Sequence, residues 1–79
     1  MIKIIYEKNK STIQSVIFSK DKWSLEDAEK WLKDNGYKYS KMDEKEKTYR
    51  FRQEDPKLFK FFRYSKEIKP GLKFDYGIK

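Results

Sequence analysis

The chain has 79 residues and a net charge of +7, from 20 basic and 13 acidic side chains, and it contains neither cysteine nor histidine. This length allows a single domain, residues 1–79, with a small core and no deep substrate cavity. The missing residue types exclude disulfides, the usual zinc sites, and Ser-His-Asp or Cys-His catalysis.

The first 36 residues predict a β-hairpin followed by one helix. In residues 2–6 Ile2, Ile4 and Tyr6 alternate with Lys3 and Ile5, and residues 12–18 are rich in β-branched side chains, so each segment is expected to form a strand. The helix is expected at about residues 24–35, where Ser24 is a suitable N-cap and Asn35-Gly36 a left-handed stop. Its apolar residues lie on one stripe, which indicates packing against a core.

The central residues predict two more strands and a turn. Tyr37 and Tyr39 alternate with lysines, which favours a short strand, and residues 43–46 read as an acidic turn. Residues 48–53 alternate cleanly and place Arg50 and Arg52 on the same face of a strand. Asp55-Pro56 should end that strand.

The last part of the chain predicts an antiparallel hairpin. Residues 57–61 are ambiguous between a helical turn and an extended connection, whereas residues 62–68 and 72–78 alternate on either side of the Pro70-Gly71 turn. The predicted fold class is therefore α+β, with one helix packed on an antiparallel sheet of five or six strands. Because the sheet has unpaired edges, the oligomeric state could be a monomer or a dimer, although lysine-rich strands argue against edge pairing.

The remaining chemistry favours binding over catalysis. The carboxylates of residues 43–46 and 54–55 are neighbours in turns, whereas a two-carboxylate hydrolase needs opposed groups across a cleft. There is no glycine-rich phosphate loop, since the only glycines are Gly36, Gly71 and Gly77. We therefore expect a non-enzymatic protein with no cofactor and no metal site.

The positive charge lies in the second half of the chain. Residues 1–36 carry a net charge of +1 and residues 37–79 one of +6, which indicates a polyanionic partner unless the lysines serve only solubility. Basic residues recur every third position from residue 57 to residue 69, between aromatic residues, as in single-strand binders. The candidate nucleic-acid-binding residues are Arg50, Arg52, Lys57, Lys60, Arg63, Tyr64, Lys66 and Lys69.

Two features weaken this interpretation. A spacing of three would divide the basic residues between both faces of a strand. The aromatic rings are also what a small core needs, so we expect most of them to be buried. Tyr39, Tyr64 and Tyr76 are the best candidates for partial exposure, because a hydroxyl tolerates a wet edge.

The segments VIFSKDKWSLEDAEKWLKDNGYK, YRFRQEDP and FFRYSKEIKPGLKFDYG follow one another in an order that resembles a small uncharacterised domain of tailed bacteriophages and other viruses. The resemblance covers about residues 15–79 and rests on Trp23, Ala28, residues 31–32, 36–37 and 50–53. Asn35 stands where that family has His, and Leu72 where it has Ile. The family occurs alone or beside capsid-maturation protease and other head proteins, so the resemblance implies a viral, non-secreted protein and no particular activity.

Together these observations predict a small viral accessory protein that acts by binding in the host cytoplasm or in the virion. No stretch approaches the roughly 20 apolar residues of a membrane span, so no membrane partner is expected. The first hypothesis is binding to nucleic acid through backbone contacts. The alternative is a protein-interaction module that meets an acidic host or viral surface, either as an inhibitor of a host defence nuclease, like an anti-CRISPR protein, or as a virion assembly factor.

Overall fold

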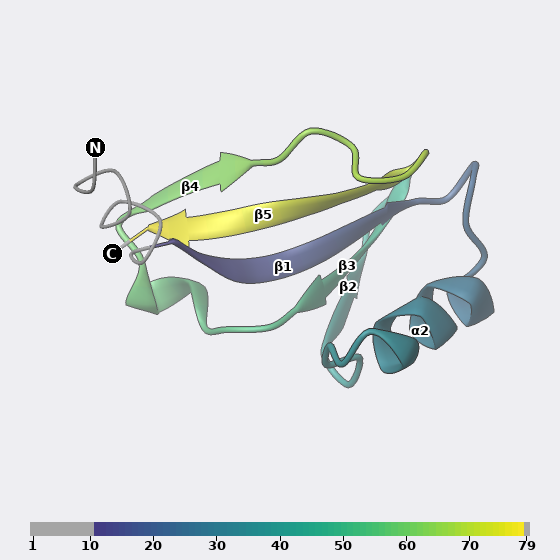
Figure 1. Ribbon diagram of the computed structural model, residues 1–79, viewed down its shortest axis with the longest axis horizontal. Helices are drawn as coiled ribbons and strands as arrows, with labels where there is room; N and C mark the ends of the chain where they lie inside the picture. Colours follow the sequence, from purple (N-terminus) through teal and green to yellow (C-terminus); the bar gives the residue numbers. More distant parts are fainter. Residues whose placement is uncertain (1–10, 79) are drawn as a thin grey trace, which may run out of the picture.

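The computed structural model describes residues 11–78. They form one helix packed with a five-stranded antiparallel sheet, so the predicted α+β fold is confirmed (Figure 1). The sheet order is β2-β3-β1-β5-β4. The elements are β1 (Ser11–Ser19), α2 (Leu25–Asp34), β2 (Met42–Glu44), β3 (Thr48–Arg52), the 3₁₀ helix η1 (Pro56–Leu58), β4 (Phe61–Tyr64) and β5 (Leu72–Ile78). The strand predicted at residues 2–6 lies outside the described residues.

Strand β1 is the centre of the sheet and confirms the strand predicted at residues 12–18. It pairs antiparallel with β3 on one side and with β5 on the other. Its β-branched and aromatic residues suit a central strand that has a neighbouring strand on each side. The pairing with β5 shifts register between Ile13 and Ser15, which marks a β-bulge at Gln14.

Helix α2 begins and ends where its capping residues predict. The Ser24 hydroxyl accepts a hydrogen bond from the backbone N–H of Asp27 at 3.1 Å. At the other end Gly36 has a φ of +80°, and the N–H of Tyr37 donates to the carbonyl of Leu32 at 2.8 Å. This is the 6→1 bond of a Schellman motif, which satisfies a carbonyl that the helix leaves free.

The hydrophobic core lies between α2 and one face of the sheet. Alternate residues of β1, β3 and β5 point toward the helix, as period-two strands require. The buried core residues are Val16, Phe18, Phe51, Leu72 and Phe74 from the sheet and Ala28 and Leu32 from the helix. The apolar stripe of the helix is therefore a core stripe, as its spacing predicts. Phe18 contacts three rings edge-on: Trp23, Trp31 and Phe51.

The predicted strand at Tyr37 and Tyr39 is wrong, because the chain there is irregular and the short strand β2 begins only at Met42. The backbone of Lys38 has a different partner: its N–H and carbonyl both bond the side-chain amide of Gln53 at 2.8 Å. The acidic turn is also misplaced. Asp43 and Glu44 belong to β2, and the connection to β3 is residues 45–47.

The C-terminal hairpin is confirmed, with β4 antiparallel to β5 and Gly71 at a φ of +79° in the connection. The ambiguous residues 57–61 divide between η1 and the start of β4. The side chain of Asp55 accepts a hydrogen bond from the backbone N–H of Lys57 at 2.9 Å and so caps η1. Since β4 pairs only with β5 among the described strands, it is an edge of the sheet.

Candidate nucleic-acid interface

The sheet face opposite α2 carries the polar residues; we call it the open face. Pairing places Ser15 beside Arg52 and Asp75, and Asp75 beside Tyr64. Directly opposed residues of an antiparallel pair share a face. Arg50 and Arg52 therefore lie on one face, as predicted, and Phe62 and Tyr64 of the edge strand lie on the same face.

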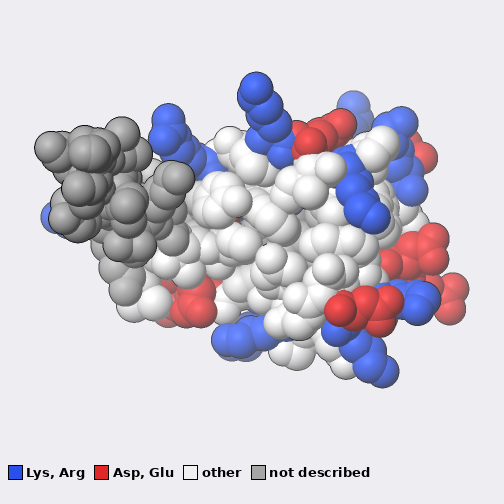
Figure 2. All heavy atoms as spheres, viewed as in Figure 1, with Lys and Arg blue, Asp and Glu red and all other residues white. Residues whose placement is uncertain are grey.

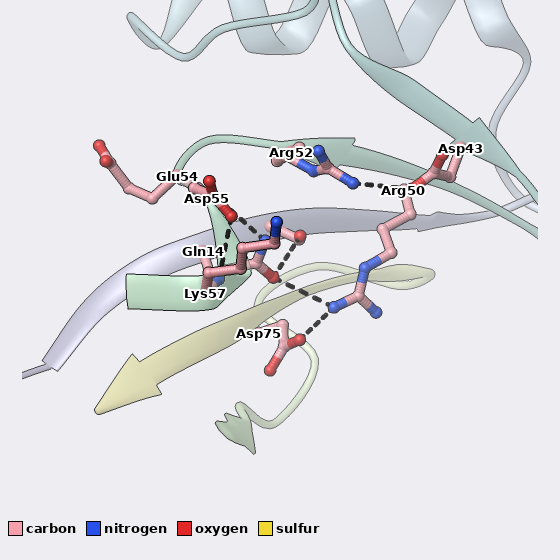
Figure 3. A network of polar contacts seen from close by, with 9 residues as sticks. Gln14, Asp43, Arg50, Arg52, Glu54, Asp55, Lys57 and Asp75 are labelled. Carbon is pink, nitrogen blue, oxygen red and sulfur yellow. Dashed lines mark hydrogen bonds and ion pairs between the residues drawn. The ribbon is translucent and has the colours of Figure 1, made fainter. Parts of the chain in front are cut away.

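The centre of the open face is an ion pair between Arg50 and Asp75 (Figure 3). The Asp75 side chain is 2% exposed and that of Arg50 is 26% exposed. Arg50 also donates to Gln14 Oε1 at 3.2 Å. Burial acts to lower the pKa of Arg50, but the Tyr64 hydroxyl and the Asp75 carboxylate outweigh it and raise that pKa above its ordinary value. Arg50 therefore stays charged while the protein is folded.

Gln14, at the bulge of β1, completes this network. Its side-chain oxygen accepts from the Ser15 hydroxyl at 2.7 Å, and its side-chain nitrogen donates to the carbonyl of Glu54 at 2.9 Å. The backbone carbonyl of Gln14 accepts from the N–H of Gln53 at 2.7 Å. Both polar atoms of the buried Gln14 amide thus have hydrogen-bond partners, which fixes the connection after β3 against β1.

Asp75 differs from Gln14 in being only half satisfied. One carboxylate oxygen, Oδ2, accepts from Arg50, whereas the buried Oδ1 has no hydrogen-bond partner among residues 11–78. Figure 3 shows Oδ1 pointing away from Arg50 and Gln14. A buried acceptor without a partner is uncommon and costs free energy.

A shallow hollow of about 260 Å³ lies over this network. Asp75 and Gln14 form part of its floor, and its sides come from β3 and from the edge strand β4. The side residues include Arg50, Arg52, Phe62 and Tyr64. The residues that line the hollow therefore bring together guanidinium donors, the Asp75 carboxylate and aromatic rings.

The edge strand β4 is exposed along its whole length. Phe61 is 65%, Phe62 45% and Tyr64 61% exposed, whereas Phe59, just before the strand, is buried at 8%. The Nζ of Lys73 lies 4.8 Å from the centre of the Tyr64 ring. The exposure predicted for Tyr64 is confirmed, and of the neighbouring aromatic residues Phe59 belongs to the buried set whereas Phe61 and Phe62 do not. An edge strand far from the helix has nothing among the described elements to cover it.

The structure divides the predicted basic residues into groups. Lys57 lies on η1, Lys60 and Arg63 lie at β4, and Lys66 follows it; all four are exposed. Arg63 points to the α2 side of the sheet because it pairs with Tyr76. The spacing of three thus does divide the strip between faces.

Three of the predicted basic residues do not belong to an unpaired basic strip along β4. Arg50 is engaged with Asp75, and Arg52 lies 3.9 Å from the Asp43 carboxylate. Lys69 lies near Trp23 and Trp31, in a groove of about 650 Å³ beside α2 rather than at the hollow. The residues that meet at the hollow are therefore Arg50, Arg52 and Tyr64.

Sequence reasoning missed Gln14, Phe62 and Asp75 as residues of this site. Asp75 lies within the alternating residues 72–78, and nothing local marks it as the partner of Arg50, because that contact depends on the register of β3, β1 and β5. The aromatic run at residues 59–64 contained Phe62, but its exposure follows from the edge position of β4.

Charged side chains crowd the rim of the molecule in the view of Figure 2, and a broad uncharged area occupies the middle of that face. The basic side chains on this face are thus separate from one another and do not form one continuous patch. No group of three or more potential ligand residues in the part of the chain that the structure describes could hold a metal ion. Within residues 11–78, no helix has the length and apolar character needed to cross a membrane.

Comparison of the chain with protein-family models, curated proteins and solved structures gave no match. The resemblance to the small bacteriophage domain therefore stays a prediction.

Proposed function

We propose that the protein binds single-stranded nucleic acid along β4 and the adjoining open face. The observation that carries this proposal is the exposure of Phe61, Phe62 and Tyr64 on one edge strand. Bases stack on exposed aromatic rings whatever their sequence, while basic side chains contact phosphates. Lys60, Arg63, Lys66 and Lys73 provide that charge around the strand.

The arrangement favours single strands over duplexes. Exposed rings on an edge strand can accept unstacked bases, whereas the bases of a duplex are already stacked on each other. Because Phe61 and Phe62 point to opposite faces of β4, a single strand would cross the edge of the sheet. The hollow lies on the open-face side of that path.

Fluorescence anisotropy with a labelled 20-nucleotide single strand tests this function. If three or four phosphates are neutralised, the slope of log K against log salt should be about −2 to −3. Arg63→Gln should reduce the steepness by about 0.7, whereas Lys33→Gln, the same charge change on α2, should leave the slope unchanged. Phe61→Leu should weaken binding by about fivefold or more through lost stacking. Affinity that is independent of salt, or equally weakened by Lys33→Gln, contradicts the proposal.

A protein partner is the second candidate, and one observation favours it. Leu58, which precedes β4 in the sequence, is 54% exposed, and Ile68, which follows it, is 48% exposed. Aliphatic side chains contact neither phosphates nor charges, but they anchor protein interfaces, and an open edge strand can pair with an extended segment. In a virus such a partner would be an acidic surface of a host defence nuclease or of a virion protein.

A pull-down from host lysate separates the two candidates. Capture of a protein that is lost with Ile68→Ser, while Ile68→Ser leaves oligonucleotide binding unchanged, supports the interaction module. Oligonucleotide binding that is weakened by Arg63→Gln and unchanged by Ile68→Ser, with no protein captured, supports nucleic acid. Viral origin and action in the host cytoplasm or the virion are part of the same proposal and rest on the sequence resemblance.

A further inference from the structure

We propose that the open-face hollow receives a single nucleobase and selects bases that carry an exocyclic amino group. This inference rests on the proposed binding of single-stranded nucleic acid. It starts from Asp75 Oδ1, a buried carboxylate oxygen with no partner in the described chain. Oδ2 already accepts from Arg50, so Oδ1 is the oxygen of this carboxylate that still lacks a partner in the described chain.

The surroundings of Oδ1 define the chemistry of its ligand. Arg50 contacts the other oxygen of the same carboxylate and has five N–H donors, of which the contacts with Gln14 and Asp75 use two. A planar group with a donor next to an acceptor fits this pair, because the donor meets Oδ1 and the acceptor meets the guanidinium. An ammonium or phosphate group fits less well, since it offers only donors or only acceptors.

The size and the sides of the hollow point to a base rather than a larger ligand. Its volume of about 260 Å³ is below the roughly 300–1,000 Å³ of pockets for drug-sized ligands. Phe62 and Tyr64 offer a flat face for stacking at its edge, and both belong to the strand along which the nucleic acid is proposed to run. Tyr64 is 61% exposed, so its ring can change rotamer on the fast timescale of surface side chains and adjust to a base in the hollow.

The hydrogen-bond pattern favours cytosine and adenine over thymine. Their amino groups project from the ring edge beside a ring nitrogen acceptor, so a carboxylate can accept from them without meeting another oxygen. The ring N–H of thymine is recessed between two carbonyls, whose lone pairs would face the Asp75 carboxylate. The free oxygen therefore discriminates by accepting an amino hydrogen and by repelling a carbonyl.

The test uses labelled thymidine oligonucleotides with one central position changed. For the wild-type protein, central cytosine or adenine should bind at least about fivefold more tightly than thymine, the expected size for one good base contact. Central 2-pyrimidinone, which is cytosine without its amino group, should lose this gain. This comparison needs no protein variant, so it stands even where a substitution at Asp75 impairs folding.

Asp75→Asn supplies the second arm, because an amide no longer offers a carboxylate at that position. It should reduce the preference for cytosine over thymine, taken as the ratio of the two affinities of the same variant, to less than twofold. Glu46→Gln, the same charge change in the exposed turn after β2, should keep the preference intact. Circular dichroism of each variant checks its fold.

Each outcome separates this inference from the function on which it rests. Salt-dependent binding with equal affinity for all central bases overturns the base pocket and leaves the proposed function standing. A cytosine preference that survives in folded Asp75→Asn also overturns it. Failure of the wild-type protein to bind any single strand refutes both.

Discussion

Removal of the Arg50 charge should destabilise the protein far more than removal of any other basic side chain at the candidate interface. In Arg50→Met the aliphatic stem remains, so the change isolates the guanidinium. Asp75, 2% exposed, would then keep a buried charge without its counter-ion, and Gln14 Oε1 would lose a donor. Breaking a buried pair in this way costs about 3–5 kcal/mol.

The partial exposure of Arg50 lowers that figure. Its side chain is 26% exposed, so solvent screens part of the interaction, and we expect a loss of about 2–3 kcal/mol. A domain of this size has a total stability of about 4–12 kcal/mol. The melting temperature should therefore fall by about 10–20 °C. Urea unfolding followed by the fluorescence of Trp23 and Trp31 measures the free energy directly.

A double-mutant cycle with Asp75→Asn completes the experiment. The double variant should be more stable than the sum of the two single changes implies, by about 1–2 kcal/mol, because no unpaired charge remains buried. Arg63→Met serves as the matched control and should change stability by less than about 0.5 kcal/mol, since Arg63 is exposed on an edge strand. A loss below about 1 kcal/mol for Arg50→Met, or a coupling near zero, would refute this account of the open face.

Three further substitutions test the frame that holds the interface. Ser24→Ala should cost about 1 kcal/mol in urea unfolding, because it removes the N-cap of α2; an unchanged midpoint contradicts this. Gly77→Ala should cost about 1–3 kcal/mol and expose the segment before β4 to proteolysis, since the added Cβ would overlap the Phe59 ring; equal protease resistance excludes that clash. Trp23→Phe should cost about 0.5–1.5 kcal/mol through the lost 2.9 Å hydrogen bond to the Pro70 carbonyl, and wild-type stability by calorimetry would argue against it.

Local patterns were enough to predict most of the fold. The helix is defined by its own caps, and three strands alternate with the period that a half-buried sheet imposes. Tyr37 and Tyr39 show where this reasoning fails. Their alternation with lysine has the period of a strand, but the backbone at Lys38 bonds the side chain of Gln53, which is 15 residues away.

The candidate site was less predictable because it depends on register and topology. Arg50 and Asp75 are 25 residues apart, on strands that are both neighbours of β1, and no local signal links them. The same limit applies to Phe61 and Phe62. A run of aromatic residues reads the same whether it fills a core or lies on an edge, and only the sheet order decides between the two.

The two edges of the sheet differ in a way that bears on function. Residues 41–47, around the edge strand β2, hold three basic and three acidic side chains, whereas residues 57–69, around β4, hold five basic and one acidic. An approaching polyanion therefore gains attraction at β4 and little at β2. Natural edge strands are commonly kept short and flanked by lysine to prevent strand pairing. The four-residue length of β4 and its lysines act against strand pairing. Its exposed rings, those of Phe61, Phe62 and Tyr64, act in the opposite direction, since large apolar rings at an edge promote association. The proposed function accounts for their exposure through stacking with a ligand that the same lysines attract.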